Sequence, residues 1–201
     1  MNTFYLVRHG KKERRPGDVA LTSTGHQEAQ LTANCFASLA TGEMKFAALY
    51  CSPMRRCVET ARPIAAALTL QPVIDLRLRE RANWGDTPGQ SMEEFVAEWE
   101  RCSADRSYAP LGGQSAYQAG HNCAAALRDA AAAYPNCHII VTTHGGTITD
   151  FLRNQYNAQA LATYNSAYLH MAECSITSVS FDGLQFDLQT LAADAHLGPK
   201  S

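Results

Sequence analysis

The sequence predicts an α/β fold, a three-layer α/β/α sandwich around a mostly parallel sheet, and three observations predict it. Short apolar runs alternate with helical patterns over residues 3–153, which is typical of parallel strands covered by helices on both faces. Two strand-like segments flank Asp182-Gly183, a two-residue hairpin signal, so an antiparallel pair is expected at one sheet edge. Residues 83–114 are rich in Gly and Pro and break the alternation, which predicts a lid inserted after the third strand.

Four apolar runs are expected to form buried strands. They are TFYLV at 3–7, FAALYC at 46–51, PVIDL at 72–76 and HIIVTT at 138–143.

Helical periodicity occupies the intervals between these runs. Residues 22–40 place Ala and Phe side chains on one face, and Thr24 with Gln27 predicts a capping box at the start. Residues 55–68 repeat the pattern, although Pro63 should kink that helix or mark its restart. Two further helices are expected, over about 117–133 and directly after His144.

Length and composition predict one globular domain over residues 1–201, with the lid at approximately 83–114. The net charge of −2 gives no electrostatic case for nucleic acid or an anionic membrane as a partner. Seven cysteines without a C-x-x-C pair argue against a disulfide framework or a zinc ribbon. No secretory leader pattern and no apolar run of about 20 residues is present, so a soluble cytoplasmic protein is expected.

Charged and polar side chains follow all four predicted strands. In an open parallel sheet, ligands bind outside the carboxyl ends of the strands, so these side chains are expected to converge on one rim. They are Arg8, His9 and Gly10 after the first strand, residues 52–56 (SPMRR) after the second, Arg79, Glu80 and Arg81 after the third, and His144, Gly145 and Gly146 after the fourth.

This set of residue types favours a phosphate site. Guanidinium groups match phosphate oxygens two at a time, and helix N-termini add backbone N–H donors. A histidine among cations stays unprotonated, which leaves one ring nitrogen free to attack phosphorus, while a second imidazole stabilises the transferring group. Glu80 is the one carboxylate expected at the rim directly after a strand, and it is the candidate general acid.

Other interpretations of the same residues stay open at this point. Taken singly, His9 is an ordinary structural or surface histidine, His144 a helix cap, and Arg56 a solvated helix charge. Two histidines with a glutamate also suggest a metal site, but H-x-x-x-H spacing is absent and the arginines would repel a divalent ion. Glu93 and Glu94 are alternative acids, although carboxylates at a helix start commonly serve only the helix dipole.

Taken in order, seven motifs resemble the histidine phosphatase superfamily, the phosphoglycerate-mutase-like proteins. The motifs are LVRHG (6–10), LTSTGHQEA (21–29), SPMRRCVETA (52–61), LRERANWGDTPG (78–89), GGQS (112–115), THGG (143–146) and CSIT (174–177).

The resemblance implies roles for individual residues. His9 would be the nucleophile that becomes phosphohistidine, and Glu80 falls where the family has its proton donor. The family chemistry needs no metal and no cofactor. The implied phosphate pocket comprises Arg8, Arg56 and His144 as a second catalytic histidine, with the backbone of Gly145.

Several departures weaken the case for phosphoglycerate mutase. The RHG motif continues into a basic run from Lys11 to Arg15, GGQS replaces the usual G-G-E-S, and His121 stands where an arginine is often found. The basic run is either a solvated loop or a border of the cleft that favours polyanionic substrates. Lys11, Lys12 and Arg81 are accordingly candidate substrate-binding residues.

These observations predict a metal-independent phosphomonoesterase that acts through phospho-His9. A phosphoglycerate-type mutase is the alternative within enzymes, and a catalytically inactive binder of phospho-ligands or phosphoproteins is the alternative of another class. The expected substrate is a small phosphate ester, and a phosphoprotein is the alternative substrate. Phe95 and Trp99 lie on one helical face, where lid packing is favoured over a substrate pocket or a homodimer contact.

Overall fold

The structure, a computed structural model, describes residues 1–41, 44–162 and 171–198. Six strands form one sheet in the order β3-β2-β4-β1-β5-β6. The pairs β1–β4, β2–β4 and β2–β3 are parallel, and β5 and β6 are antiparallel to their neighbours. The strands are β1 (Asn2–Arg8), β2 (Phe46–Cys51), β3 (Pro72–Ile74), β4 (His138–Thr143), β5 (Ile176–Phe181) and β6 (Phe186–Ala193).

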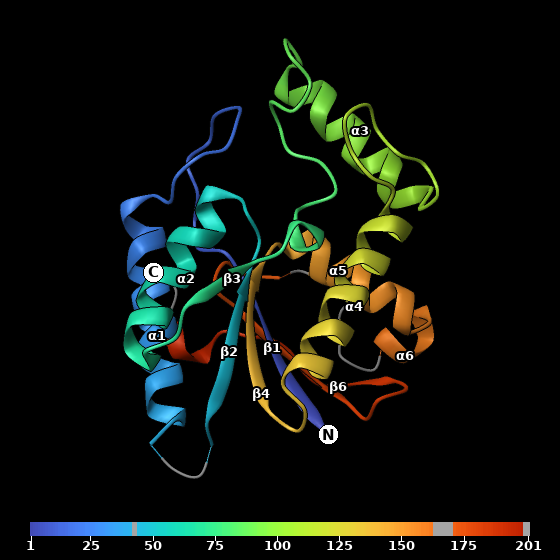
Figure 1. The fold of residues 1–201 in the computed structure, drawn as a ribbon. Coiled ribbons are helices and arrows are strands. Elements are labelled where there is room, and N and C mark those ends of the chain that lie inside the picture. The colour runs from blue at the N-terminus through green and yellow to red at the C-terminus, as the bar shows by residue number, and fades with distance from the viewer. Residues whose placement is uncertain (42–43, 163–170, 199–201) are drawn as a thin grey trace.

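Helices cover both faces of this sheet, which confirms the predicted three-layer architecture (Figure 1). The side chains of α1 and α2 share one hydrophobic core with the sheet, and those of α4, α5 and α6 share the other. The described helices are α1 (Ser23–Leu39), α2 (Arg55–Leu68), α3 (Met92–Ala104), α4 (Ala116–Ala133), α5 (Gly145–Gln155) and α6 (Ala158–Ala162), with 3-10 turns at Leu76–Leu78 and Ala195–Leu197.

The two cores follow from the period-2 pattern of the central strands. In β1, Phe4 and Leu6 face the core shared with α4 and α5, while Val7 faces α1 and α2. In β4, Ile139 and Ile140 divide between the two cores in the same way. Because both faces are buried, these strands read as continuous apolar runs, and this is why they could be predicted from the sequence.

Two predicted element boundaries are wrong. The third strand ends at Ile74, because the Asp75 carboxylate accepts the Arg77 backbone N–H at 2.9 Å and caps a 3-10 turn. Helix α1 is capped two residues earlier than predicted, at Thr22 instead of Thr24, and the Thr22 hydroxyl accepts the Gly25 N–H at 3.1 Å. Glu80 therefore follows a 3-10 turn rather than a strand.

Two further expectations concern a proline and a turn. Helix α2 continues through Pro63, so the expected restart does not occur. The hairpin of β5 and β6 is confirmed, but residues 182–185 separate the paired Phe181 and Phe186, and the Asp182 carboxylate accepts the N–H groups of the turn.

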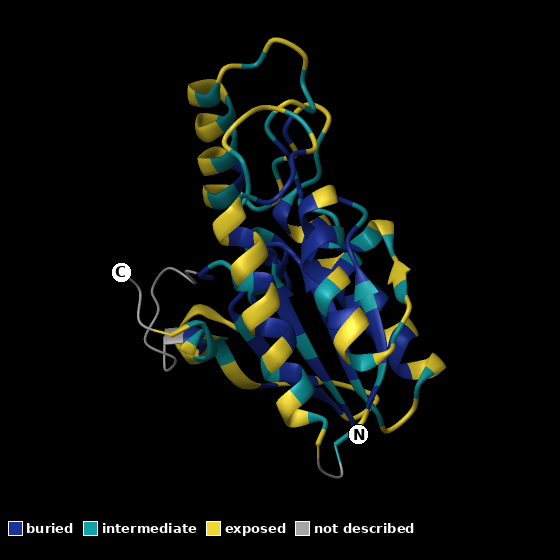
Figure 2. Cartoon of the chain, turned by 90° about the vertical axis from the view of Figure 1, so that its left-hand side faces the viewer, coloured by how far each residue is buried: buried dark blue, intermediate teal, exposed yellow. Residues whose placement is uncertain are grey.

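The segment inserted after β3 projects beyond the carboxyl ends of the strands (Figure 1). Its helix α3 begins with a complete capping box, in which Ser91 and Glu94 exchange hydrogen bonds. Cys102 is the one buried residue of α3. In Figure 2 the burial accordingly concentrates in the body of the molecule, and the projecting segment is mostly half-buried or exposed.

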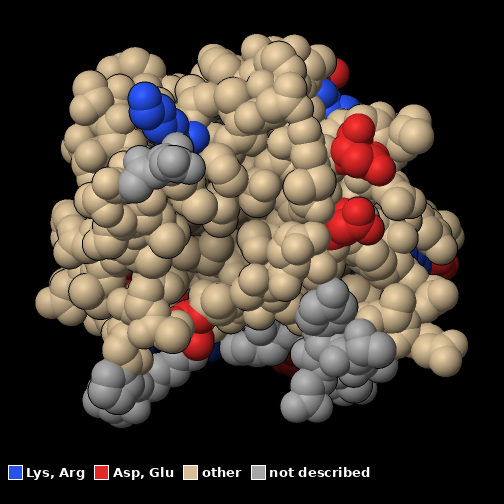
Figure 3. Space-filling model, turned by 90° about the horizontal axis from the view of Figure 1, so that it is seen from below, with Lys and Arg blue, Asp and Glu red and all other residues tan. Residues whose placement is uncertain are grey.

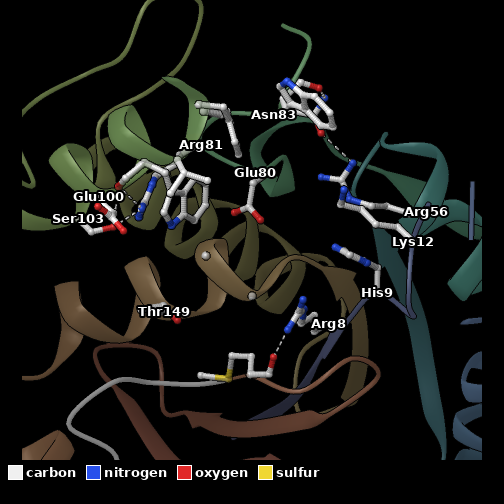
Figure 4. A pocket seen from close by; sticks show the side chains of 18 of the residues that line it. Arg8, His9, Lys12, Arg56, Glu80, Arg81, Asn83, Glu100, Ser103 and Thr149 are labelled. Carbon is white, nitrogen blue, oxygen red and sulfur yellow. Dashed lines mark hydrogen bonds between the residues drawn. The ribbon is translucent and has the colours of Figure 1, made fainter. Parts of the chain in front are cut away.

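The described helices are all too short or too polar to cross a bilayer. At the end of the molecule opposite α3, the visible side chains of the described residues include few Lys or Arg, and these do not gather into a patch (Figure 3). The cations that the sequence places after strand ends lie instead at the other end of the sheet (Figure 4).

Candidate active site

A cavity of about 810 Å³ lies between the carboxyl ends of the parallel strands and α3. Strands β2, β4 and β1 are adjacent and parallel, so the residues that follow them must meet. Figure 4 shows the result, with Arg8, His9, Lys12 and Arg56 grouped on one side of the cavity and Glu80 facing them.

His9 follows β1 and is 4% exposed. Its Nδ1 lies 2.8 Å from the carbonyl oxygen of Gly10. Because a carbonyl only accepts, Nδ1 carries the proton and Nε2 keeps its lone pair. Burial, followed by the charge of Arg56, lowers the pKa of His9 well below its usual range, so the ring stays neutral. The geometry therefore gives His9 the tautomer and charge that a nucleophile requires.

His144 follows β4 and lies beside His9, with ring centroids 5.3 Å apart and planes at 69°. Its Nε2 is 2.8 Å from the hydroxyl oxygen of Ser52. His144 is the N-cap residue of α5, but its side chain makes no capping hydrogen bond and faces Ser52 and His9 instead. Burial, followed by the charge of Arg56, also lowers the pKa of His144 well below its usual range.

Arg56 is 2% exposed, and its side chain makes one hydrogen bond, from Nη1 to Asn83 Oδ1 at 3.1 Å, within the described chain. Its Nε is buried without a partner, and no described carboxylate lies within ion-pair distance. An uncompensated buried charge is costly, and an anionic ligand would remove that cost. Arg56 is therefore not the solvated helix charge that its position in α2 allowed.

Glu80 is 12% exposed and lies between the two histidines and α3. Its Oε1 is 3.3 Å from the Thr147 hydroxyl, and its Oε2 is 3.9 Å from His144 Nδ1. Burial raises the pKa of Glu80, although Arg56 and Arg81 oppose the shift. A raised pKa keeps more of the protonated form near neutral pH, which suits a proton donor.

The other predicted phosphate ligands lie at the cavity. Arg8 lines it, while its terminal nitrogens donate to the Met171 carbonyl and, at 3.0 Å, to the Glu173 carboxylate. Gly145 begins α5, and a Cβ on it would lie 3.2 Å from Arg8 Cδ. The glycine thus lets the arginine approach the N-terminus of the helix, where free N–H groups attract anions.

The predicted substrate-binding residues differ in whether they face the cavity and in whether their charge is free. Lys12 is half-buried and lines the cavity, but Lys11 is exposed, and its N–H donates to Glu28 at 2.7 Å. Successive residues of an extended segment point in opposite directions, so only one of the two lysines faces the cavity. Arg81 lines the cavity too, but Asp150 accepts two hydrogen bonds from it at 2.9 Å, and the pair is almost wholly buried.

The lid residues considered from the sequence also differ in whether they face the cavity. Glu93 and Glu94 are exposed, and Glu94 serves the capping box, so the structural interpretation of these carboxylates is the one supported. Phe95 and Trp99 are half-buried and line the cavity, with ring centroids 6.0 Å apart. Both also border other residues of the inserted segment, so they line the cavity as well as pack within the lid.

Several supporting residues were not singled out from the sequence. The Ser52 hydroxyl contacts His144, Asn83 Oδ1 accepts from Arg56, and the Thr60 hydroxyl accepts the Gly10 N–H at 3.0 Å. Ser52 and Thr60 fall inside the quoted SPMRRCVETA motif, so the motif itself carried a signal for them. Asn83 falls inside the quoted LRERANWGDTPG motif, but its contact with Arg56 joins segments far apart in the chain, and the motif did not indicate that contact.

Within the described residues, no group of three or more His, Cys, Asp or Glu side chains is placed to hold a metal ion. The polar groups of the site are instead two neutral imidazoles, a carboxyl group with a raised pKa, and guanidinium groups around a helix N-terminus. Such a set can bind a phosphate group, offer it a nitrogen nucleophile and supply a proton.

The fold is that of the histidine phosphatases. The sequence pattern of the histidine phosphatase superfamily (branch 1) matches residues 4–194, and the chain belongs to this superfamily.

Comparison with individual proteins gives modest sequence identities. Phosphoglycerate mutase-like protein 4 of Arabidopsis thaliana is 32% identical over 157 residues, which cover 71% of this chain and 66% of that protein. Mycobacterial glucosyl-3-phosphoglycerate phosphatase superposes with a TM-score of 0.73 at 22% identity, covering 96% of this chain and 99% of that one. Phosphoserine phosphatase of Entamoeba histolytica, solved with 3-phosphoglyceric acid, has a TM-score of 0.72 at 22% identity, covering 98% and 100%. At such identities the two structures establish the likeness of fold.

Proposed function

We propose that the chain is a phosphomonoesterase that transfers a phosphoryl group from an ester to His9 and then to water. One observation carries the proposal: Arg56, buried and without a carboxylate partner in the described chain, lies beside a neutral His9 whose Nδ1 is held by a carbonyl. The similar solved structures include phosphatases for glucosyl-3-phosphoglycerate and phosphoserine, which supports the same reaction class.

In the first half-reaction, the lone pair of His9 Nε2 forms a bond to phosphorus as the ester P–O bond breaks. Arg8, Arg56 and the N-terminus of α5 stabilise the equatorial oxygens of the transferring group. In this proposal the Ser52 hydroxyl, 2.8 Å from His144 Nε2, donates to that nitrogen, and Nδ1–H of His144 donates to the same oxygens. The proton of Glu80 passes to the leaving alkoxide, which departs as a neutral alcohol.

In the second half-reaction, the Glu80 carboxylate takes a proton from water as the water oxygen attacks phosphorus. The N–P bond breaks, its electron pair returns to His9 Nε2, and inorganic phosphate leaves. Glu80 and His9 are then in their starting protonation states, so the cycle balances without a cofactor.

Hydrolysis of p-nitrophenyl phosphate with a chelator present tests the proposal. His9→Ala should lower kcat/KM by at least about 10³-fold, because the nucleophile is lost. Glu80→Gln should lower kcat for an alkyl phosphate by roughly 10²-fold or more, and less for p-nitrophenyl phosphate, whose leaving group needs little protonation. His121→Ala, an exposed histidine on α4, is the matched control and should retain full activity.

The pH profile is part of the same test. A neutral His9 is required, and its lowered pKa keeps it neutral into mildly acidic solution. A protonated Glu80 is required for the first step, and its raised pKa extends that form upward in pH. We expect kcat for an alkyl phosphate to fall with rising pH on the alkaline side, and Glu80→Gln to flatten that limb. If kcat of Glu80→Gln still falls on the alkaline side as it does in the native protein, Glu80 is not the proton donor.

A phosphoglycerate-type mutase would use the same pocket and return the phosphoryl group to a second hydroxyl. We keep the mutase as a second candidate because the Arabidopsis relative is named as phosphoglycerate mutase-like. Incubation with 3-phosphoglycerate separates the two outcomes: inorganic phosphate indicates a phosphatase, and 2-phosphoglycerate that depends on a bisphosphate primer indicates a mutase. Vanadate binding without turnover of any ester would indicate a phospho-ligand binder.

A further inference from the structure

The cavity extends well beyond the phosphate site, and its extension has a different character. The cations of the phosphate site lie on one side of Glu80, and on the other side Arg81, Glu100, Ser103 and Thr149 line the cavity (Figure 4), together with a group of apolar side chains. This part, which we call the apolar chamber, is lined by the apolar residues Ala82, Met92, Phe95, Val96, Trp99 and Ala104. We propose that the apolar chamber binds the alcohol part of the substrate, and that the substrates are phosphate monoesters of large alkyl or aryl alcohols. This inference deepens the proposed function and rests on it.

The orientation of α3 is the first support. Met92, Phe95, Val96 and Trp99 follow the spacing of one helical face, and this face lines the cavity instead of packing on the sheet. Val96 remains 42% exposed. Leaving such a face in water costs free energy that an apolar ligand would recover.

The position of Trp99 is the second support. A Cβ on Gly146 would lie 2.6 Å from the Trp99 ring and 2.5 Å from Glu80 Oε1, so the indole and the general acid lie side by side over the start of α5. An alcohol oxygen that takes its proton from Glu80 must therefore carry its carbon atoms past Trp99. A glycine at 146 is what leaves room for both side chains.

The rigidity of this wall is the third support. The Arg81 guanidinium stacks on the Trp99 ring at 3.7 Å. Asp150 accepts two hydrogen bonds from Arg81, and Ser103 and the Trp99 carbonyl accept further ones. The indole is thus held in place before a ligand arrives, which reduces the entropy lost on binding.

Charge and length define the alcohol further. Arg81 is neutralised by Asp150, so Glu100 and Arg153 are the other charged side chains that line the chamber side. Gly145 and Arg153 both line the cavity and lie eight residues apart on α5, about 12 Å along the helix axis. The chamber therefore suits an extended apolar group with a polar outer end. Beyond Glu80 the described lining holds only one cation besides the neutralised Arg81, namely Arg153 at the outer end, and Lys11 lies outside the lining, so a polyanionic alcohol part would find few cations there.

A series of ethyl, butyl, hexyl and octyl phosphates tests the inference. Each buried methylene should lower KM about fourfold, with little change in kcat, because chain contacts are made equally in the ground and transition states. Phospholactate, a short polyanionic ester, should have a KM no lower than that of ethyl phosphate.

Variants assign the effect to the chamber. Phe95→Ala should raise KM for octyl phosphate at least tenfold and leave KM for ethyl phosphate within about twofold. Leu111→Ala, an exposed apolar residue of the same inserted segment that does not line the cavity, should change neither value. Trp84 and Trp99, the chain's two tryptophans, line the cavity, so octyl phosphate should also change tryptophan fluorescence in His9→Ala, where turnover is removed.

The outcomes are distinguishable. Equal KM values for ethyl and octyl phosphate in an enzyme that hydrolyses both would overturn the inference and leave the proposed function standing. An unchanged chain-length dependence in Phe95→Ala would overturn the assignment to the apolar chamber. No turnover of p-nitrophenyl phosphate or of any alkyl phosphate would overturn the proposed function, and the inference with it.

Discussion

Arg56 shows how a single side chain is held in an unfavourable state at the site. Its guanidinium is 2% exposed, contacts Asn83, and has no carboxylate within ion-pair distance in the described chain. The same charge helps to lower the pKa of both His9 and His144. One buried cation thus attracts an anion and keeps the two imidazoles neutral, and the folded state bears the cost of burying it.

We therefore expect Arg56→Met to stabilise the protein while it abolishes phosphate binding. Replacing an unpaired buried charge with an apolar side chain of similar length should raise the free energy of unfolding by about 1 kcal/mol or more. Urea denaturation without phosphate measures this, and vanadate titration measures the loss of binding. A lower stability in Arg56→Met would mean that the Asn83 contact outweighs the cost of burying the charge.

At the scale of elements, the closeness of α4 and α5 positions the phosphate site. Gly120 on α4 faces the backbone of α5, and a Cβ on it would lie 2.4 Å from the Asp150 carbonyl oxygen. Asp150 in turn holds Arg81 and, through it, Trp99. The N-terminus of α5 and the wall of the apolar chamber thus depend on one close contact between helices.

Gly120→Ala tests this dependence. Helix propensity alone would make the substitution stabilising by up to about 1 kcal/mol. Because the nearest atom, the Asp150 carbonyl oxygen, is backbone and cannot rotate away, we expect instead a loss of about 1–3 kcal/mol, measured by urea denaturation. A gain in stability would show that α4 and α5 separate freely.

At the scale of the whole molecule, two buried histidines and one half-buried histidine link stability to pH. Burial is the first cause that lowers the pKa of His9, His144 and the half-buried His196, and the lowering is largest for His9 and His144, which are neutral when folded. In the unfolded chain they would titrate near the usual value of 6.5. Below that pH the unfolded state binds more protons than the folded state, so the free energy of unfolding must fall.

We expect stability to fall as pH decreases from about 7 to 5.5, by at most about 1.4 kcal/mol per pH unit for each histidine. His9→Gln should reduce this slope, because one of the three contributors is removed. The raised pKa of Glu80 acts in the opposite direction, so Glu80→Gln should steepen the slope. Thermal denaturation across this range measures both effects, and identical slopes in His9→Gln and the native protein would contradict the linkage.

The sequence by itself determined the parallel strands, the helices on both faces, and the meeting of His9, Arg56 and His144. Each depends on a local signal, because a strand buried on both faces is a continuous apolar run and the residue after it must lie at the sheet rim. One boundary was not predicted from the sequence: the side-chain cap at Asp75 ends the third strand early, so Glu80 follows a 3-10 turn.

Only the tertiary structure decided which neighbours of these residues matter. Lys12 faces the cavity and Lys11 does not, Arg81 is neutralised by Asp150, and Trp99 lines the cavity as well as packing within the lid. Each of these outcomes depends on contacts between segments far apart in the chain, which no local pattern encodes. The phosphate chemistry was therefore predictable from the strand ends, whereas the shape and polarity of the chamber emerge only when α3 and α5 are placed around it.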